Sequence, residues 1–526
     1  MIYDIGIDLG TTYSCLAIMN ATGSPTVVKN NQEHDTTPSV ITYDNGEFCV
    51  GETAKDQAPF AECTVEAVKR NMSEADTWRM TIGGKEYGPI ELSARIVRKL
   101  VDDFLEKYPD AELKSATITC PAYFGPKERE ATRQAGIIAG FEEVNIIEEP
   151  TAAAISYGLK NSGEKNILVY DLGGGTFDVT IMRVAENKFK VLSTDGDCNL
   201  GGKDWDAALI EIIKQKVCEN GNLTIEELES DDDALTDIRT KAEGQKISLS
   251  SLKEVKGAVR IGTSTVKYVV SREEFEMATA GELQATMMKV DSALESAKLT
   301  MDDIDDIVLV GGSTRMPQVK AGLISTYPSC ESKIHVHDPD LAVATGAAIY
   351  QNTRDVEVEN VVDPVSGKTV EGKIAKFAPT MGSIEIEKVL SHTMGVKVWD
   401  NVEKKDLISN IIFKNCPLPI KNKGEYCVNH DHQTALNVQI FQSDFEESDD
   451  NREVAVEECE EVGSFLVDIP SDSCEGEAVF VTIEANEKAD IICTCTFRDI
   501  TKSHTLAAKG LLNDEQIRSA RKSIMG

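Results

Sequence analysis

Residues 168–178 read Leu-Val-Tyr-Asp-Leu-Gly-Gly-Gly-Thr-Phe-Asp, an apolar strand that runs into an aspartate, three glycines and a threonine. Residues 5–12 repeat the arrangement as Ile-Gly-Ile-Asp-Leu-Gly-Thr-Thr. A carboxylate at the end of a buried strand, next to glycine amides that a ligand can approach closely, suits a phosphate held beside a magnesium ion. Two such turns in different halves of the chain predict a cleft that holds a nucleotide from both sides.

A third glycine turn, Gly-Gly-Ser-Thr-Arg at residues 311–315, also follows an apolar strand, at 306–310. A single Asp-Leu-Gly is a common strand ending and by itself favours a structural role. Three similar turns in one chain favour a phosphate site, and the guanidinium of Arg315 is then expected near a nucleoside. The chain has neither a Walker loop nor a correctly placed dinucleotide-binding glycine motif.

The composition indicates a multidomain protein with reduced cysteines. The 526 residues exceed what one core usually supports, and the net charge of −35 argues against nucleic acid or an anionic membrane as the main partner. No apolar run reaches the ~18 to 20 residues of a membrane span, and the N-terminus lacks a basic leader, so we expect a cytoplasmic protein. The 13 cysteines are scattered. The close pairs at 493/495, 335/337 and 430/432 are too isolated to predict a metal site.

The chain divides by pattern into two regions. Residues 1–350 alternate between short apolar strands and helical patterns, as in strand 116–120 before helix 127–139, which indicates an α/β architecture. Residues 351–382 are polar and predict a loosely specified connector. Residues 396–507 alternate apolar and polar positions, as at 435–441 and 478–483, which predicts an all-β sandwich.

Two further segments have simple interpretations. The acidic stretch 444–450 is typical of a solvated hairpin tip. Residues 513–524 predict a short amphipathic helix capped by Asn513. We expect this helix to cover no other part of the protein.

Five ordered motifs, at residues 5–15, 121–124, 149–154, 171–178 and 307–317, make the first region resemble the nucleotide-binding domain of the heat shock protein 70 family, the DnaK-type molecular chaperones. The resemblance implies an α/β actin-like ATPase, ribonuclease H-like and two-lobed, followed by an all-β sandwich that binds peptides. It implies a nucleotide-binding domain at 1–352, a connector and inter-domain linker at 353–395, a substrate-binding domain at 396–507, and a helical stub at 508–526.

The resemblance also assigns roles to residues, with ATP and Mg²⁺ as cofactors. Lys69 is expected to hold the attacking water and the γ-phosphate, while Glu149 and Asp178 orient water and magnesium ligands. Without their motifs, Lys69 and Glu149 would be interpreted as ordinary surface charges. Magnesium is expected on Asp8 and Asp171, mainly through its water shell. The expected catalytic residues are Lys69, Glu149, Asp171, Thr176 and Asp178. The expected nucleotide-binding residues are Asp8, Gly10, Thr11, Thr12, Tyr13, Gly173, Gly174, Gly175, Gly201, Gly202, Glu243, Lys246, Ser250, Gly311, Gly312, Ser313, Arg315 and Asp340.

The adenine side departs from the family pattern at one position. The arginine that usually follows the lysine at 246, and stacks on the base, is Ile247 here. Loss of a cation–π contact predicts ATP binding weaker by about 2- to 30-fold.

The second region resembles the family's peptide-binding sandwich, but less closely than the first region resembles the nucleotide-binding domain. The resemblance implies that Val396, Tyr426, Leu436 and Val438 line a pocket for an aliphatic side chain, with Trp399 as part of an arch over the peptide. From the pattern alone, alternating apolar residues in a sandwich are more often core, and Trp399 is equally consistent with packing.

Two departures bear on coupling between the domains. The linker at 383–388 reads Ser-Ile-Glu-Ile-Glu-Lys, with two apolar residues where the family has four. Burying one unpaired glutamate would remove most of a typical coupling of ~1 to 3 kcal/mol. The sequence also stops before the helical lid that the family has beyond Asn513, as expected of either a lidless or a C-terminally truncated member, and without a lid peptide is expected to exchange quickly even in the ADP state.

Three functions remain open from the sequence. The first is an ATP-dependent chaperone that binds exposed hydrophobic peptide segments, with unfolded clients, a J-domain cochaperone and a nucleotide exchange factor as partners. The second is a non-cycling ATP-binding scaffold or regulatory adaptor, which the linker, Ile247 and the missing lid favour. The third is a sugar or metabolite kinase on the same actin-like fold, which would need an acceptor site.

Overall fold

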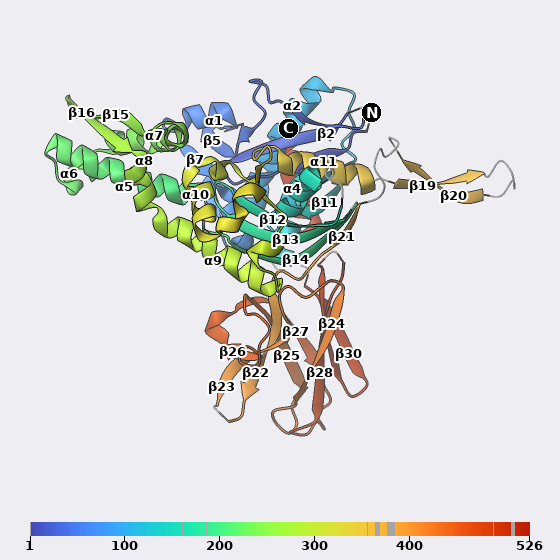
Figure 1. Ribbon diagram of the computed structural model, residues 1–526. Helices are drawn as coiled ribbons and strands as arrows, with labels where there is room; N and C mark the ends of the chain where they lie inside the picture. Colours follow the sequence, from blue (N-terminus) through green and yellow to red (C-terminus); the bar gives the residue numbers. More distant parts are fainter. Residues whose placement is uncertain are drawn as a thin grey trace.

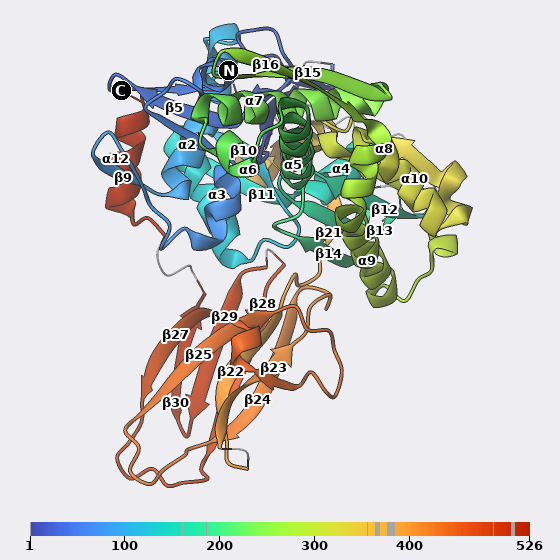
Figure 2. The same ribbon diagram turned by 90° about the vertical axis from the view of Figure 1, so that its left-hand side faces the viewer.

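The computed structural model describes residues 2–20, 22–158, 163–185, 187–354, 356–362, 369–375, 384–402, 404–487, 489–506 and 511–525. Two α/β lobes face each other, and a β sandwich lies below them in the view of Figure 1 and again in Figure 2. Among the residues just given, no helix is long and apolar enough to cross a membrane.

The first lobe is an open sheet covered by helices. Its sheet has the order β11 (Glu143–Glu148), β10 (Ser115–Cys120), β1 (Ile5–Asp8), β2 (Tyr13–Met19) and β3 (Pro25–Val28), and β4 (Thr37–Pro38) pairs with β2. Helices α2 (Pro89–Lys107) and α3 (Pro126–Ala139) bury its apolar side chains. The remaining elements are β5 (Val40–Asp44), β6 (Glu47–Val50), α1 (Glu52–Gln57), β7 (Cys63–Glu66), the 3-10 helix η1 (Val68–Glu74), β8 (Met80–Ile82) and β9 (Lys85–Tyr87).

The second lobe is a larger sheet with its own core. Its order is β18 (Ile334–Val336), β17 (Asp306–Val310), β12 (Lys165–Leu172), β13 (Phe177–Ala185), β14 (Lys188–Asp197) and β21 (Glu385–Glu387). Tyr170, Phe177 and Trp205 are fully buried at its centre. The remaining elements are α5 (Gly202–Gly221), α6 (Ile225–Glu229), α7 (Asp232–Ser251), β15 (Glu254–Ile261), β16 (Ser264–Ser271), α8 (Arg272–Ala278), α9 (Ala280–Ser296), η2 (Met301–Asp303), η3 (Gly312–Arg315), α10 (Pro317–Thr326) and η4 (Pro328–Lys333). The predicted α/β architecture is confirmed.

Two helices, α4 (Glu149–Gly158) and α11 (Ala342–Arg354), join the lobes. They share one buried cluster with side chains from both sheets. At their contact the backbones nearly touch, because a Cβ on Gly346 would lie 1.8 Å from the carbonyl oxygen of Ala152. A side chain at 346 would therefore force the two helices apart.

The third part is an all-β sandwich, as the alternation predicts. One sheet has the order β26 (Glu453–Ala455), β23 (Lys405–Ile412), β22 (Thr393–Asp400), β25 (Ala435–Ser443) and β27 (Glu460–Asp468). The other has the order β24 (Ile420–Cys427), β28 (Ala478–Ala485), β29 (Ile491–Phe497) and β30 (Ile500–Thr505). The short η5 (Val456–Glu458) follows β26. Side chains from both inner faces form a single core.

The described parts of the predicted connector after α11, residues 356–362 and 369–375, are paired strands, while residues 363–368 and 376–382 lie outside the described residues. An antiparallel hairpin, β19 (Val356–Val362) and β20 (Thr369–Ala375), projects away from the lobes (Figure 1). Strand β21 then joins the second lobe, in parallel with β14. The side chains of Glu385 and Glu387 are 60% and 64% exposed and form ion pairs of 2.8 Å each with Lys188 and Lys190. The concern that this linker buries an unpaired glutamate is therefore wrong.

The last helix, α12 (Asp514–Met525), packs against the first lobe. Asn513 caps it, since its Oδ1 accepts hydrogen bonds from the amides of Glu515 at 3.1 Å and Gln516 at 3.0 Å. Arg521 donates to the carbonyl of Gly140 at 2.8 Å. The predicted helix and its cap are confirmed, but the expectation that it covers nothing is wrong, because its apolar side chains lie on α3.

Candidate functional site

A cavity of about 760 Å³ opens between the two lobes, and the three glycine turns of the sequence meet in it. The turn after β1 faces the turn after β12, and a Cβ on Gly174 would lie 1.8 Å from the Thr12 hydroxyl oxygen. Only glycine permits this approach. The predicted residues that line the cavity are Asp8, Gly10, Thr11, Thr12, Tyr13, Lys69, Glu149, Asp171, Gly173, Gly174, Thr176, Gly202, Glu243, Lys246, Ser250, Gly311, Gly312, Ser313, Arg315 and Asp340.

Three predicted residues lie behind the lining instead. Gly175 and Gly201 pack against each other, since a Cβ on Gly201 would lie 2.5 Å from the Gly175 amide nitrogen. Their role is to let the turns of β12 and α5 come together. Asp178 is fully buried, and its Oδ1 accepts a hydrogen bond of 3.0 Å from the amide of Ala122. This bond fixes the carboxylate between the lobes.

A buried ion pair lies at the floor of the cavity. Lys69 comes from η1 and pairs with Glu149, the first residue of α4, and both side chains are less than 10% exposed. Burial alone would lower the pKa of Lys69, but the charges of Glu149 and Asp8 outweigh it and raise the pKa. Lys69 therefore stays protonated and presents a fixed cation to the cavity.

The carboxyl groups of three aspartates near this lysine have raised pKa values. Burial, with repulsion from Glu149, raises the pKa of Asp8 to about 7 and that of Asp178 to about 8. The pKa of Asp171 is also raised well above its ordinary value, by burial and by Glu149. A bound cation reduces the electrostatic repulsion among carboxylates in such a cluster.

The donor atoms fit magnesium. Carboxylates and hydroxyls are the hard oxygen ligands that this ion takes, and the cavity-lining Thr12 hydroxyl has no hydrogen-bond partner among the described residues. Within that same part of the chain, no three carboxylate, histidine or cysteine side chains converge as a preformed metal site. Mg²⁺ usually keeps several of its waters and takes one or two carboxylates, so this arrangement suits it.

The opposite wall of the cavity is built from α7. Lys246 pairs with Asp206 at 2.8 Å and donates to the carbonyl of Gly202 at 2.8 Å. Arg315 is directed at Asp340, with a nitrogen–oxygen distance of 2.6 Å. Ile247 is 59% exposed at the rim. An exposed aliphatic side chain can still pack on a base, but it supplies no charge there.

Sequence reasoning missed Lys55 and Asp206. Lys55 lies on α1 of the first lobe and pairs with Glu243 on α7 of the second, at 2.5 Å, while it also donates to the Tyr13 hydroxyl at 2.7 Å. Its position in an ordinary polar helix gives no signal in the sequence. The pair ties one lobe to the other beside the cavity, which Glu243 and Tyr13 line.

Replacing Glu243 with glutamine should speed the release of bound nucleotide about fivefold, because the neutral amide holds Lys55 less strongly. The measurement is stopped-flow displacement of a fluorescent ADP analogue. Glu229→Gln is the matched control, since Glu229 pairs with Lys214 within the second lobe at 3.3 Å. Equal release rates from the two variants would show that the pair across the cavity does not hold the lobes together.

The predicted peptide-binding residues lie in the sandwich. Val396 and Val438 are buried in its core, and Tyr426 and Leu436 pack against that core. The Tyr426 hydroxyl lies 3.1 Å from Ser409 Oγ. Trp399 is 44% exposed, at the end of β22. The structure thus brings four of the five together and leaves the tryptophan outside the cluster.

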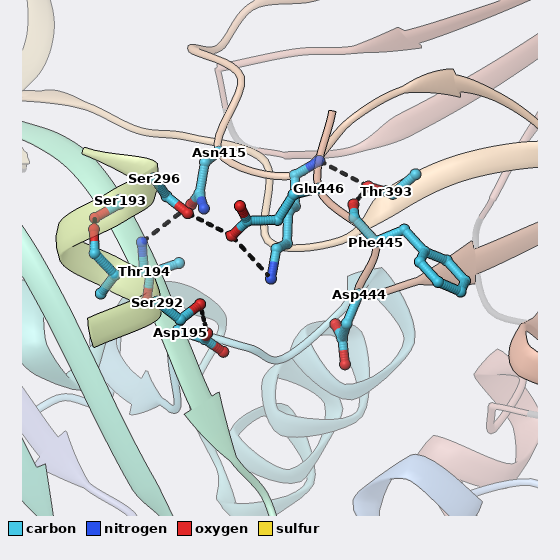
Figure 3. A network of polar contacts seen from close by, with 12 residues as sticks. Ser193, Thr194, Asp195, Ser292, Ser296, Thr393, Asn415, Asp444, Phe445 and Glu446 are labelled. Carbon is cyan, nitrogen blue, oxygen red and sulfur yellow. Dashed lines mark hydrogen bonds and ion pairs between the residues drawn. The ribbon is translucent and has the colours of Figure 1, made fainter. Parts of the chain in front are cut away.

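A polar joint connects the sandwich to the lobes (Figure 3). Asn415 accepts a hydrogen bond of 3.0 Å from the amide of Thr194, and Glu446 accepts one of 2.5 Å from Ser296. Asp444 pairs with His392 at 3.0 Å, whose other ring nitrogen reaches the carbonyl of Tyr123. Asp444 is 77% exposed, as a solvated stretch predicts, whereas Glu446 is 42% exposed and contacts the second lobe, so the interpretation of residues 444–450 as a solvated hairpin tip is wrong at Glu446.

Comparison with known proteins agrees with this geometry. A family profile described as "Hsp70 protein" matches residues 4–78 and 72–522. A "Chaperone protein DnaK" of Halobacterium salinarum is 35% identical over 525 residues, which cover 98% of this chain and 76% of that protein. DnaK proteins of Thermosipho melanesiensis and Thermotoga maritima are 38% and 37% identical, each over 84% of this chain and 70% of theirs.

Proposed function

This chain belongs to the Hsp70 family, and from that membership we propose which of its residues carry out phosphoryl transfer, nucleotide binding and peptide binding in an ATP-dependent chaperone. As a member it is an ATPase that binds ATP with Mg²⁺ and binds unfolded peptides. Membership favours this function over a sugar or metabolite kinase. The observation that carries our proposal is the buried Lys69–Glu149 pair between two Asp-Leu-Gly turns.

We propose that phosphoryl transfer to water depends on fixed charge and placement. The ammonium of Lys69 stabilises charge that develops on the γ-phosphoryl group, and Glu149 holds that lysine in place. Glycine amides and the hydroxyls of Thr11, Thr12 and Thr176 donate to phosphate oxygens. Bound Mg²⁺ supplies further neutralisation of phosphate charge, and Asp8 and Asp171 would hold it.

We further propose Lys246, Glu243, Ser250, Arg315 and Asp340 as the nucleoside side of the site. What supports this is their common position on the wall of the cavity that α7, η3 and the turn before α11 form. The peptide-binding roles of Val396, Tyr426, Leu436, Val438 and Trp399 stay proposals of the same kind, as do the four domain boundaries. A J-domain cochaperone and a nucleotide exchange factor are proposed partners, and the cytoplasmic location stays a prediction.

The deciding experiment is single-turnover ATP hydrolysis with and without an extended apolar peptide and a J-domain protein. We expect hydrolysis to accelerate with each of them. Tight ATP binding whose hydrolysis no partner changes would favour the non-cycling scaffold instead. The docked linker and the retained Lys69–Glu149 pair count against that alternative.

A further inference from the structure

The linker segment 384–388 presents two different faces to the second lobe. Strand β21 pairs with β14 so that Glu385 lies opposite Lys188 and Glu387 opposite Lys190. Ile384 and Ile386 pack against the buried cluster between the sheets. The outer face is thus a ladder of two ion pairs, and the inner face is apolar.

The end of the segment enters a buried charged site. Lys388 lies 2.9 Å from Glu148, which also pairs with Arg129, and all three side chains are between 10% and 12% exposed. Burial alone would raise the pKa of Glu148, but the charges and hydrogen bonds of Lys388 and Arg129 bring it to about 2. The carbonyl of Lys388 accepts a hydrogen bond of 2.9 Å from the amide of Leu418 in the sandwich. One linker residue therefore contacts both domains.

These contacts select a single register. A slip of one residue would turn the glutamates into the apolar cluster and the isoleucines into solvent, which is strongly unfavourable. A slip of two residues would keep the alternation of faces, but it would carry Lys388 away from Glu148 and leave that carboxylate with Arg129 alone. The ladder excludes odd slips and the buried lysine excludes even ones.

We propose that the edge of β14, together with Glu148, is a charge-selective docking surface for the linker of this chain. It fits a strand that alternates isoleucine and glutamate and ends in a lysine. Charge complementarity thus replaces part of the apolar contact that a longer aliphatic run would make, so docking weakens as salt is added. The inference concerns docking alone and holds whether or not hydrolysis responds to partners.

Hydrogen exchange of the amides of residues 384–388 in the full chain, without nucleotide, tests this directly. Raising salt from about 0.05 M to about 0.5 M should speed their exchange about threefold. The variant Lys188→Glu/Lys190→Glu should speed it about tenfold, because two attractive pairs become repulsive. Adding Glu385→Lys/Glu387→Lys to that variant should restore the rate to within about twofold.

The control for net charge is Lys256→Glu/Lys421→Glu. Both lysines are exposed and pair with glutamates on β15 and β28, away from the linker. This variant changes the charge by the same amount and should leave the exchange of 384–388 unchanged. Equal acceleration in the control, no rescue by charge exchange, or no response to salt would each overturn the proposal.

Lys388 is tested separately. Lys388→Gln should speed exchange about 30-fold, since it leaves a buried carboxylate with only one cation. Lys388→Arg, which keeps the charge, should recover most of that loss. Unchanged thermal unfolding of the lobes would show that the variants fold, and equal exchange in the glutamine and arginine variants would show that the charge at 388 does not select the linker.

Discussion

Replacing Lys69 with alanine should slow ATP hydrolysis by about 100- to 1,000-fold and leave ATP bound. The lysine is the protonated partner of Glu149 at the floor of the cavity, and it lies among acids whose pKa values are raised by burial and by repulsion from Glu149. Removing it takes away a fixed cation where charge develops in the transition state. Glycine amides and the α7 wall, which we propose hold the nucleotide, are unaffected.

The measurement is single-turnover hydrolysis, with ATP affinity determined separately on the same variant. Lys99→Ala is the matched control, because Lys99 is also a partly buried, ion-paired lysine of the first lobe, 2.6 Å from Asp103, and lies outside the cavity. It should hydrolyse at nearly the normal rate. Lys69→Arg should stay slow, since a planar guanidinium cannot take the place of a compact ammonium. Normal hydrolysis in Lys69→Ala would remove the lysine from the proposed mechanism.

Replacing Gly346 with alanine should destabilise the lobes by about 3 kcal/mol or more. The new Cβ would lie 1.8 Å from the carbonyl oxygen of Ala152 and 2.5 Å from its carbonyl carbon, both backbone atoms of α4 that cannot rotate away. Helices α4 and α11 would have to separate, and the buried cluster that joins the two sheets would open with them. The thermal unfolding midpoint should fall by about 5 °C or more.

Gly281→Ala is the matched control in helix α9, because nothing lies within 4 Å of its Cβ position. Alanine there should raise stability by up to about 1 kcal/mol, through its better helix propensity. A Gly346→Ala protein that unfolds at the normal temperature would show that the two helices have room to move apart.

The sequence predicts the cleft well because its signals are local. Asp-Leu-Gly turns, apolar strands and the capped helix after Asn513 can each be recognised within about ten residues, and the structure has a strand at 306–310 as expected. The motifs also predict most residues that line the cavity. A glycine that permits two backbones to approach and a carboxylate that ends a strand need no knowledge of distant partners.

The predictions that fail concern residues whose partners lie far away in the sequence. Glu385 and Glu387 look unfavourable in the linker because their partners, Lys188 and Lys190, are almost 200 residues earlier in the chain. The contact of Glu446 with Ser296 is missed because an acidic run gives no sign of the lobe that lies behind it. Lys55 is missed for the same reason, since only the fold brings α1 opposite α7.

The docking of α12 on α3 gives the sandwich a further attachment to the lobes, in addition to the linker at 384–388 and the polar joint around Asn415 and Glu446. When one attachment opens, the others keep the detached segment close to its surface, at the high local concentration of an intramolecular tether. Rebinding then outpaces escape, as for a multivalent ligand. The sandwich should therefore separate from the lobes only when all of these attachments open together, and weakening any one alone should change how often it opens more than how far it moves.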